Sequence, residues 1–194
     1  MKTVFFDIDT QIDFLYPAGA LYVPGAERLA AAFARLNRYA AGHEIPVIST
    51  TDAHAENDPE FRDWPAHCVA GTHGQRKPAQ TLLDKRVVIP PAPGEYAIEG
   101  AGQILVEKQA LDLFTNPNLP ALLARLNADR YVVYGVVTEY CVRGALLGLL
   151  GAGQRVEVVT DAIQSLDEAA GRRTLEEFTA GGGKLTTVAE VCGA

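Results

Sequence analysis

Several features are missing from this sequence, and each absence excludes a whole class of protein. Its 194 residues contain no stretch approaching the roughly 20 apolar residues that a membrane-spanning helix needs. Lysine and arginine form no cluster and the net charge is −7, so we expect neither nucleic acid nor a membrane as partner. The three cysteines, an odd number, do not indicate a disulfide framework, and we expect reduced thiols in a cytoplasmic protein.

Nucleotide-binding signatures are missing as well. No Gly-x-Gly-x-x-Gly follows the first predicted strand, and there is no Walker A sequence. Gly181-Gly-Gly183 follows a predicted helix and is typical of its cap and turn. Because the sequence also has no internal repeat and no linker, we predict a single domain over residues 1–194.

What the sequence does contain is an alternation of β-rich runs with runs of helical spacing. The predicted strands are Thr3–Ile8, Ile45–Thr50, Arg86–Ile89, Gln103–Val106, Arg130–Val137, Arg155–Thr160 and Lys184–Thr187, and the predicted helices are Ala26–Ala41, Leu119–Leu126, Glu139–Leu150 and Asp167–Ala180. This order predicts an α/β fold, a three-layer α/β/α sandwich around a mainly parallel, Rossmann-like sheet. Functional sites in such folds gather at the carboxyl ends of the strands.

Acidic residues stand at the end of the first predicted strand. Asp7 and Asp9 are two residues apart, so they project from the same face of an extended chain. A carboxylate at the end of a hydrophobic strand needs a partner, because an unpaired one is expensive to desolvate. The pair therefore belongs to a functional site or caps a loop, and this segment alone slightly favours the loop.

Two histidines and a carboxylate follow the second predicted strand. Asp52 and His54 are separated by one residue and point the same way on an extended backbone, with His67 downstream. Two imidazoles and a carboxylate suit a catalytic transition-metal site, to which Asp58 or Glu60 could add an oxygen ligand. The alternative is a polar loop whose histidines form local hydrogen bonds.

One cysteine stands where a nucleophile would be activated. Cys141 falls in the first turn of a predicted helix, where free backbone N–H groups and the helix dipole favour a thiolate and can bind an oxyanion. A buried, inert cysteine fits the same pattern. We interpret Cys68 as buried filler and Cys192 as inert. Lys108, at the end of another predicted strand, would on its own extend to solvent.

Four segments together resemble the isochorismatase-like cysteine hydrolases and, within that superfamily, the nicotinamidases. They are Asp9-x-Gln11-x-Asp13-Phe14 with Ala18-Gly-Ala-Leu21 and Val23-Pro-Gly25, Asp52-x-His54 with Trp64-Pro-x-His67-Cys68 and Gly71-Thr72, Glu107-Lys108, and Gly135-Val-Val-Thr138-Glu-Tyr-Cys141-Val-Arg143. The resemblance runs from Thr3 to about Asp161. Each segment alone is a weak signal, whereas four in the right order at comparable spacings are a strong one.

This resemblance implies a mechanism. Cys141 would attack an amide carbonyl to form a thioester, and Asp9 would take the thiol proton and pass it to the leaving amine. Lys108 would keep Asp9 ionised and assist thiolate formation. The backbone N–H groups of Val137 and Cys141 would form the oxyanion hole, in a turn shaped by a cis peptide bond between Val136 and Val137.

The resemblance also implies a metal and partners. The metal would be one divalent transition ion, zinc first and iron or manganese as alternatives, receiving the pyridine nitrogen while Phe14 and Trp64 flank the ring. The implied metal ligands are Asp52, His54, His67 and, as a fourth, Glu60. The implied partners are a small-molecule amide and, in a homo-oligomer, further copies of the chain, with a role in NAD salvage.

Three features depart from the family pattern. Asp7 occupies a strand position that is usually apolar, so a second carboxylate lies near the site or pairs elsewhere. Asn57, Asp58 and Glu60 stand where some nicotinamidases have a further metal-loop histidine, which leaves the metal's identity open. Gln109–Phe114 replaces an aromatic-and-serine run, so no substrate contact is carried over from it.

Two other functions stay open at this stage. Another amidase of the superfamily would act on an N-carbamoyl or ureido compound, with a metal that is vestigial or absent. A non-catalytic binding module would keep only the fold. Losing one of Asp9, Lys108 and Cys141 would be enough to make a member of the family inactive. All three are present, which argues against a non-catalytic module.

Overall fold

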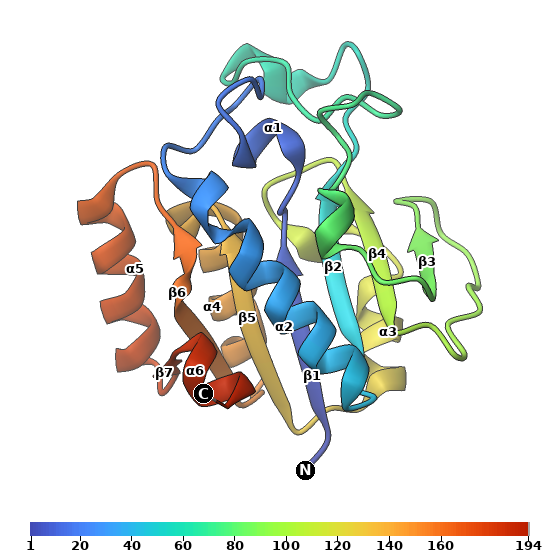
Figure 1. Cartoon of the computed structure of the whole chain (residues 1–194). Helices are drawn as coiled ribbons and strands as arrows, with labels where there is room; N and C mark the ends of the chain where they lie inside the picture. The colour runs from blue at the N-terminus through green and yellow to red at the C-terminus, as the bar shows by residue number, and fades with distance from the viewer. Residues whose placement is uncertain (194) are drawn as a thin grey trace.

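A seven-stranded sheet forms the centre of the computed structural model, which describes residues 1–193 (Figure 1). The strands are β1 (Thr3–Ile8), β2 (Val47–Asp52), β3 (Arg86–Ile89), β4 (Gln103–Lys108), β5 (Arg130–Val136), β6 (Val156–Gln164) and β7 (Lys184–Thr186). They lie in the order β3-β4-β2-β1-β5-β6-β7, and every pair of neighbours is parallel. The predicted α/β class with a mainly parallel sheet is therefore confirmed.

Helices cover both faces of the sheet. They are α1 (Ile12–Leu15), α2 (Ala30–Gly42), α3 (Leu119–Leu126), α4 (Arg143–Gly151), α5 (Glu168–Ala180) and α6 (Val188–Cys192). One apolar cluster joins the sheet to α3, α4 and α5, and a second joins the opposite face to α2 and α6 (Figure 1). These layers form the predicted three-layer sandwich. None of the helices among residues 1–193 combines the length and apolar character needed to cross a membrane.

Three strands extend beyond the runs that predict them. β6 ends at Gln164 rather than Thr160. β2 ends at Asp52 rather than Thr50, and β4 ends at Lys108 rather than Val106. In the register of these neighbouring strands, Asp52 lies directly opposite Lys108. Aspartate and lysine are both disfavoured in strands, so local propensity ends each strand early, whereas pairing between the strands continues the ladder.

The segment after β5 is also more elaborate than predicted. Instead of one helix over Glu139–Leu150, a π-helical turn over Thr138–Val142 precedes α4. Such turns are rare and frequently occur at functional sites. The short helices α1 and α6 are not predicted by the hydrophobic pattern either, because neither has enough turns to show a helical period.

Close contact between β1 and β5 brings the ends of these strands together. Gly135 has φ +128°, and a Cβ atom there would lie 2.1 Å from the Ile8 carbonyl oxygen, so only glycine fits. From β1, the chain adds β2 on one side and β5 on the other. Ligands of open α/β sheets bind outside the carboxyl ends of the strands at such a switch point.

Candidate active site

Four neighbouring strands each bring one functional side chain to this switch point. Asp9 directly follows β1, Asp52 ends β2, Lys108 ends β4, and Cys141 lies in the π-helical turn after β5. All four residues are buried. The structure thus brings together the three predicted catalytic residues and one of the predicted metal ligands.

Lys108 is the centre of the cluster. Its Nζ lies 3.0 Å from Asp9 Oδ2 and 3.6 Å from Cys141 Sγ, and it donates hydrogen bonds to Asp52 Oδ1 and, at 3.1 Å, to the Ala110 carbonyl oxygen. The side chain is only 1% exposed. The interpretation from its position alone, a lysine extending to solvent, is therefore wrong. Two carboxylates from neighbouring strands offset the desolvation of the ammonium group.

The charges of the cluster follow from burial and from Lys108. Burial lowers the pKa of Lys108, but Asp52 and Asp9 outweigh it and raise that pKa well above its ordinary value. Burial raises the pKa of Cys141, and the ammonium of Lys108 opposes that shift only in part. The same two influences leave the pKa of Asp9 raised. The prediction that the start of a helix favours a Cys141 thiolate is therefore wrong for this structure, because burial outweighs it. The cluster holds a neutral thiol beside a carboxylate that has an increased affinity for protons.

Asp9 is held in an unusual conformation. Its φ is +48°, a region that aspartate visits more readily than most residues, and its N–H donates to the Thr50 carbonyl oxygen at 3.2 Å. The Thr50 hydroxyl donates to Asp9 Oδ1 at 2.6 Å, a contact that sequence analysis did not identify. Asp9 Oδ2 is buried and has no hydrogen-bond partner of good geometry within residues 1–193. One carboxylate oxygen therefore keeps a lone pair free for a proton.

The turn that carries Cys141 has the backbone form implied by the resemblance. The peptide bond between Val136 and Val137 is cis. Val137 and Cys141 both line a pocket at the end of the sheet. Their predicted N–H donors therefore belong to residues at the wall of this pocket.

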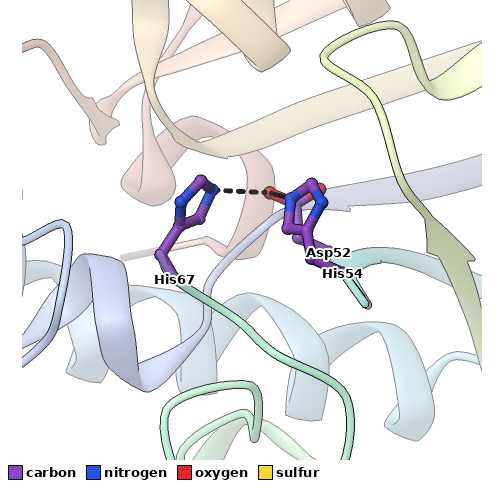
Figure 2. Close-up of side chains that lie close together, drawn as sticks. All are labelled: Asp52, His54 and His67. Carbon is purple, nitrogen blue, oxygen red and sulfur yellow. Dashed lines mark ion pairs between the residues drawn. The ribbon is translucent and has the colours of Figure 1, made fainter. Parts of the chain in front are cut away.

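Asp52, His54 and His67 converge beside the cysteine cluster. One ligand atom from each lies within 4.8 Å of the other two, and all three residues are buried. The Nε2 atoms of His54 and His67 each lie 3.9 Å from Asp52 Oδ2 (Figure 2). Burial raises the pKa of Asp52, but Lys108 and His54 together outweigh it and hold that pKa below its ordinary value. The group therefore offers a carboxylate and two imidazoles, a set that suits a divalent transition metal.

One orphaned atom supports a metal at this position. His54 Nε2 is buried and has no hydrogen-bond partner in the described part of the chain. Buried polar atoms are rarely left unpaired in folded proteins. A metal ion would satisfy this nitrogen, so the residues present fit the group that the resemblance implies.

The two candidate oxygen ligands take different positions. Glu60 Oε1 lies 4.0 Å from His67 Nε2, at the edge of the group. Asp58 instead faces the opposite side of His54, with Oδ2 3.0 Å from Nδ1. Glu60 is therefore placed toward the predicted metal position and Asp58 behind one of its ligands.

The pocket beside Cys141 is mainly apolar. Phe14 and Trp64, the residues expected to flank a substrate ring, both line it, together with Asp52, Glu60 and His67. Its other apolar lining residues, not predicted from the sequence, are Leu21, Leu111, Val136, Tyr140 and Leu166. Leu21, Val136 and Tyr140 stand in the segments that carry the family resemblance, whereas Leu111 and Leu166 come from separate loops that meet only in the folded chain.

Gln11 and Asp13, from the first motif, form hydrogen bonds to the backbone of the segments that carry the candidate metal ligands. The Gln11 side chain accepts from the Asp52 N–H at 2.7 Å and donates to the Asp52 carbonyl oxygen at 2.8 Å. Asp13 Oδ2 accepts from the Cys68 N–H at 2.7 Å. Cys68 is buried in the core next to His67 with φ +44°, so this bond supports a strained turn.

Asp7 lies apart from the site. Its Oδ2 forms an ion pair with Lys77 Nζ at 2.8 Å, and among residues 1–193 Asp7 and Asp9 have no hydrogen-bond or ion-pair partner in common. The two carboxylates were predicted to project from one face of the chain. That prediction is wrong, because β1 ends at Ile8 and the positive φ of Asp9 breaks the alternation of an extended strand.

Comparisons with known proteins agree with this geometry. The Isochorismatase domain family matches residues 3–190. A nicotinamidase of Escherichia coli (strain K12) is 26% identical over 212 residues, covering 94% of this chain and 93% of that protein. The structure of the pyrazinamidase of Pyrococcus horikoshii in complex with zinc is 26% identical, with a TM-score of 0.82 over 96% of this chain and 99% of that one.

A further structural neighbour belongs to a different enzyme. The N-carbamoylsarcosine amidase of Thermoplasma acidophilum superimposes with a TM-score of 0.77, covers 97% of each chain and is 24% identical, a likeness that shows the fold alone. The family resemblance drawn from the four sequence segments is confirmed. The chain therefore belongs to the isochorismatase family, as an amidohydrolase related to the nicotinamidases.

Proposed function

We propose that this chain is a metal-assisted cysteine amidase that hydrolyses nicotinamide to nicotinate and ammonia. The observation that carries the proposal is the cluster of Asp9, Lys108 and Cys141, in which Lys108 contacts both other residues and Cys141 lines the pocket, beside the Asp52-His54-His67 group. The similarity to a nicotinamidase and to a pyrazinamidase in complex with zinc supports it.

In the first step, Cys141 Sγ attacks the carbonyl carbon of the amide and its proton passes to Asp9. The raised pKa of Asp9 suits it to accept that proton, and the free lone pair on Oδ2 can hold it. Asp9 then donates the proton to the amide nitrogen, the carbon–nitrogen bond breaks, and ammonia leaves. The product of this step is a thioester on Cys141.

In the second step, water attacks the thioester carbon and gives one proton to Asp9. The carbon–sulfur bond breaks, the carboxylic acid leaves, and Cys141 regains its proton from Asp9. Lys108 Nζ, 3.6 Å from the sulfur, stabilises negative charge on the thiolate whenever it forms. The N–H groups of Val137 and Cys141 are our proposed donors to the oxyanion of each tetrahedral intermediate.

Asp52, His54 and His67 would hold the metal, with Glu60 as the nearest additional carboxylate. When bound, a divalent cation supplies a Lewis-acid position that can anchor a ring nitrogen. Phe14 and Trp64 would pack against the ring and help exclude water from the pocket. We propose zinc, since the similar pyrazinamidase was solved in complex with it.

The test is ammonia release from nicotinamide by purified protein with its metal content quantified. We expect turnover that is lost in Cys141→Ala, after chelation and in His54→Ala. A folded, metal-loaded protein without turnover would overturn the nicotinamide assignment. Turnover of N-carbamoyl or ureido compounds that survives in His54→Ala would instead establish the metal-independent alternative. A homo-oligomer, a cytoplasmic location and a role in NAD salvage stay predictions.

A further inference from the structure

We propose that Asp58 is a positioning residue that fixes the tautomer of His54 and joins this metal ligand to the turn that carries Glu60. The inference rests on the metal site of the proposed function. It assigns to Asp58 a role behind a ligand rather than as a ligand.

The contact between Asp58 and His54 sets which nitrogen faces the site. Asp58 Oδ2 lies 3.0 Å from His54 Nδ1, and the His54 side chain is 0% exposed. An ionised carboxylate only accepts hydrogen bonds, so Nδ1 must carry the hydrogen. In the neutral ring, the form that can bind a metal, the lone pair then lies on Nε2, the orphaned atom 3.9 Å from Asp52 Oδ2.

The second imidazole is oriented in the same way by a weaker partner. His67 Nδ1 lies 2.7 Å from the Pro65 carbonyl oxygen, which is also only an acceptor. Both rings therefore present Nε2 to the same point. Of the two rings, only His54 has a charged group behind it, and a carboxylate in this position raises the basicity of a ligating imidazole.

The other oxygen of Asp58 acts on the chain itself. Oδ1 accepts from the Glu60 N–H at 2.9 Å and so caps the short helical turn Pro59–Arg62. Phe61 of the same turn packs edge-on against the His54 ring, with centroids 5.3 Å apart. Both oxygens of Asp58 are therefore engaged, and one carboxylate couples the orientation of His54 to the position of Glu60.

The experiment compares metal binding in wild type, Asp58→Ala and Asp58→Asn, with Asp63→Asn as the matched control. Asp63 lies in the same loop, is exposed, and its side chain forms no hydrogen bond within residues 1–193. The measurements are Zn²⁺ and Co²⁺ affinity by competition with a chromogenic chelator, the Co²⁺ absorption spectrum, and the imidazole nitrogen signals of the metal-free protein by NMR.

We expect Asp58→Ala to bind both metals about 10- to 100-fold more weakly, with an altered Co²⁺ spectrum and a mixed His54 tautomer. Asp58→Asn keeps the size of the side chain but not its charge, and should lie between Ala and wild type. Asp63→Asn should match wild type in every measurement. If Asp58→Ala does not fold, the Asn variant decides by the same criteria.

The outcomes separate this inference from the proposed function. Wild-type affinity and an unchanged spectrum in both Asp58 variants would overturn the inference, even if thermal stability fell, and would leave the metal site intact. A wild-type protein that binds neither metal would overturn the metal site and the inference with it. Weaker binding in Asp63→Asn equal to that in Asp58→Asn would also overturn the specific role of Asp58.

Discussion

The first strand leads into two buried aspartate–lysine pairs that differ in how completely each carboxylate is bonded. Asp7 pairs with Lys77 at 2.8 Å and Asp9 pairs with Lys108 at 3.0 Å. The four residues are all buried, and the two aspartates are separated by one residue. The two pairs thus share chemistry, burial and origin in the sequence, so their differences reflect their surroundings.

Both carboxylate oxygens of Asp7 accept hydrogen bonds. Oδ1 accepts from the Thr10 hydroxyl at 2.8 Å, and Oδ2 accepts from Asn37 at 3.2 Å and Ser49 at 3.0 Å, besides contacting Lys77. The lysine also donates to the Thr10 hydroxyl. This pair joins the end of the long loop after β2 to the first strand.

The Asp9 pair is incomplete by comparison. Its Oδ1 accepts from the Thr50 hydroxyl, but its Oδ2 lies against the ammonium group of Lys108 without hydrogen-bond geometry and has no hydrogen-bond partner in the described part of the chain. Lys108 is in turn shared with Asp52 and Cys141. A saturated buried pair, in which both carboxylate oxygens accept hydrogen bonds, thus holds structure, whereas an unsaturated one, with one oxygen unbonded, retains the capacity to exchange a proton.

The largest effect that would sharpen this comparison is expected from Asp9→Asn. The amide cannot accept the thiol proton, so ammonia release should fall by about 10²- to 10⁴-fold, the usual contribution of a general base. The rate of Cys141 alkylation by iodoacetamide should fall as well. Circular dichroism should show an unchanged fold. Activity within about threefold of wild type would remove Asp9 from the proposed mechanism.

The next effect concerns the saturated pair. Lys77→Met leaves the Asp7 carboxylate buried without its counterion, which should lower the free energy of unfolding by about 3 to 5 kcal/mol in denaturant titrations. The matched control is Arg143→Gln, which breaks the half-exposed pair with Glu177 and should cost at most about 1 kcal/mol. Equal losses of unfolding free energy in the two variants would show that the buried pair stabilises the fold no more than the half-exposed pair does.

Removing both charges of the saturated pair should be milder than removing one. Asp7→Asn combined with Lys77→Met leaves no unpaired charge, so part of the stability lost in Lys77→Met should return. The coupling between the two substitutions should be about 0.5 to 3 kcal/mol in a double-mutant cycle. Strict additivity would mean that the two side chains do not interact.

The smallest expected effect is a shift in the acid limb of the pH–activity profile, caused by the raised pKa of Asp9 in the unsaturated pair. Burial raises the pKa of Asp9 above its ordinary value of 3.8, although Lys108 opposes the shift. The base must be ionised, so kcat/KM should fall as pH decreases through this raised pKa, and the acid limb should lie above pH 3.8. The limb should persist in Asp7→Asn, measured in the pH range where that variant stays folded. An acid limb at or below the ordinary value would contradict the raised pKa.

Much of the fold was predictable because its signals are local. β1, β3 and α3 have the predicted boundaries, since each coincides with one hydrophobic run bounded by polar or turn residues. Polar motifs at four strand ends also predicted one shared site, because parallel strands align their carboxyl ends at the same edge of the sheet. The fold class, the family resemblance and the candidate residues were therefore all available from the sequence.

The pairing of those residues depends on the folded chain. Lys108 is buried because Asp52 lies opposite it in the β2–β4 register, and Asp7 is neutralised by Lys77 from a distant loop. Neither contact has a sequence period, because each depends on which strands and loops become neighbours. For the same reason the pattern could not distinguish the aspartate that holds the loop from the one that faces the cysteine: burial and hydrogen-bond saturation exist only in the folded chain.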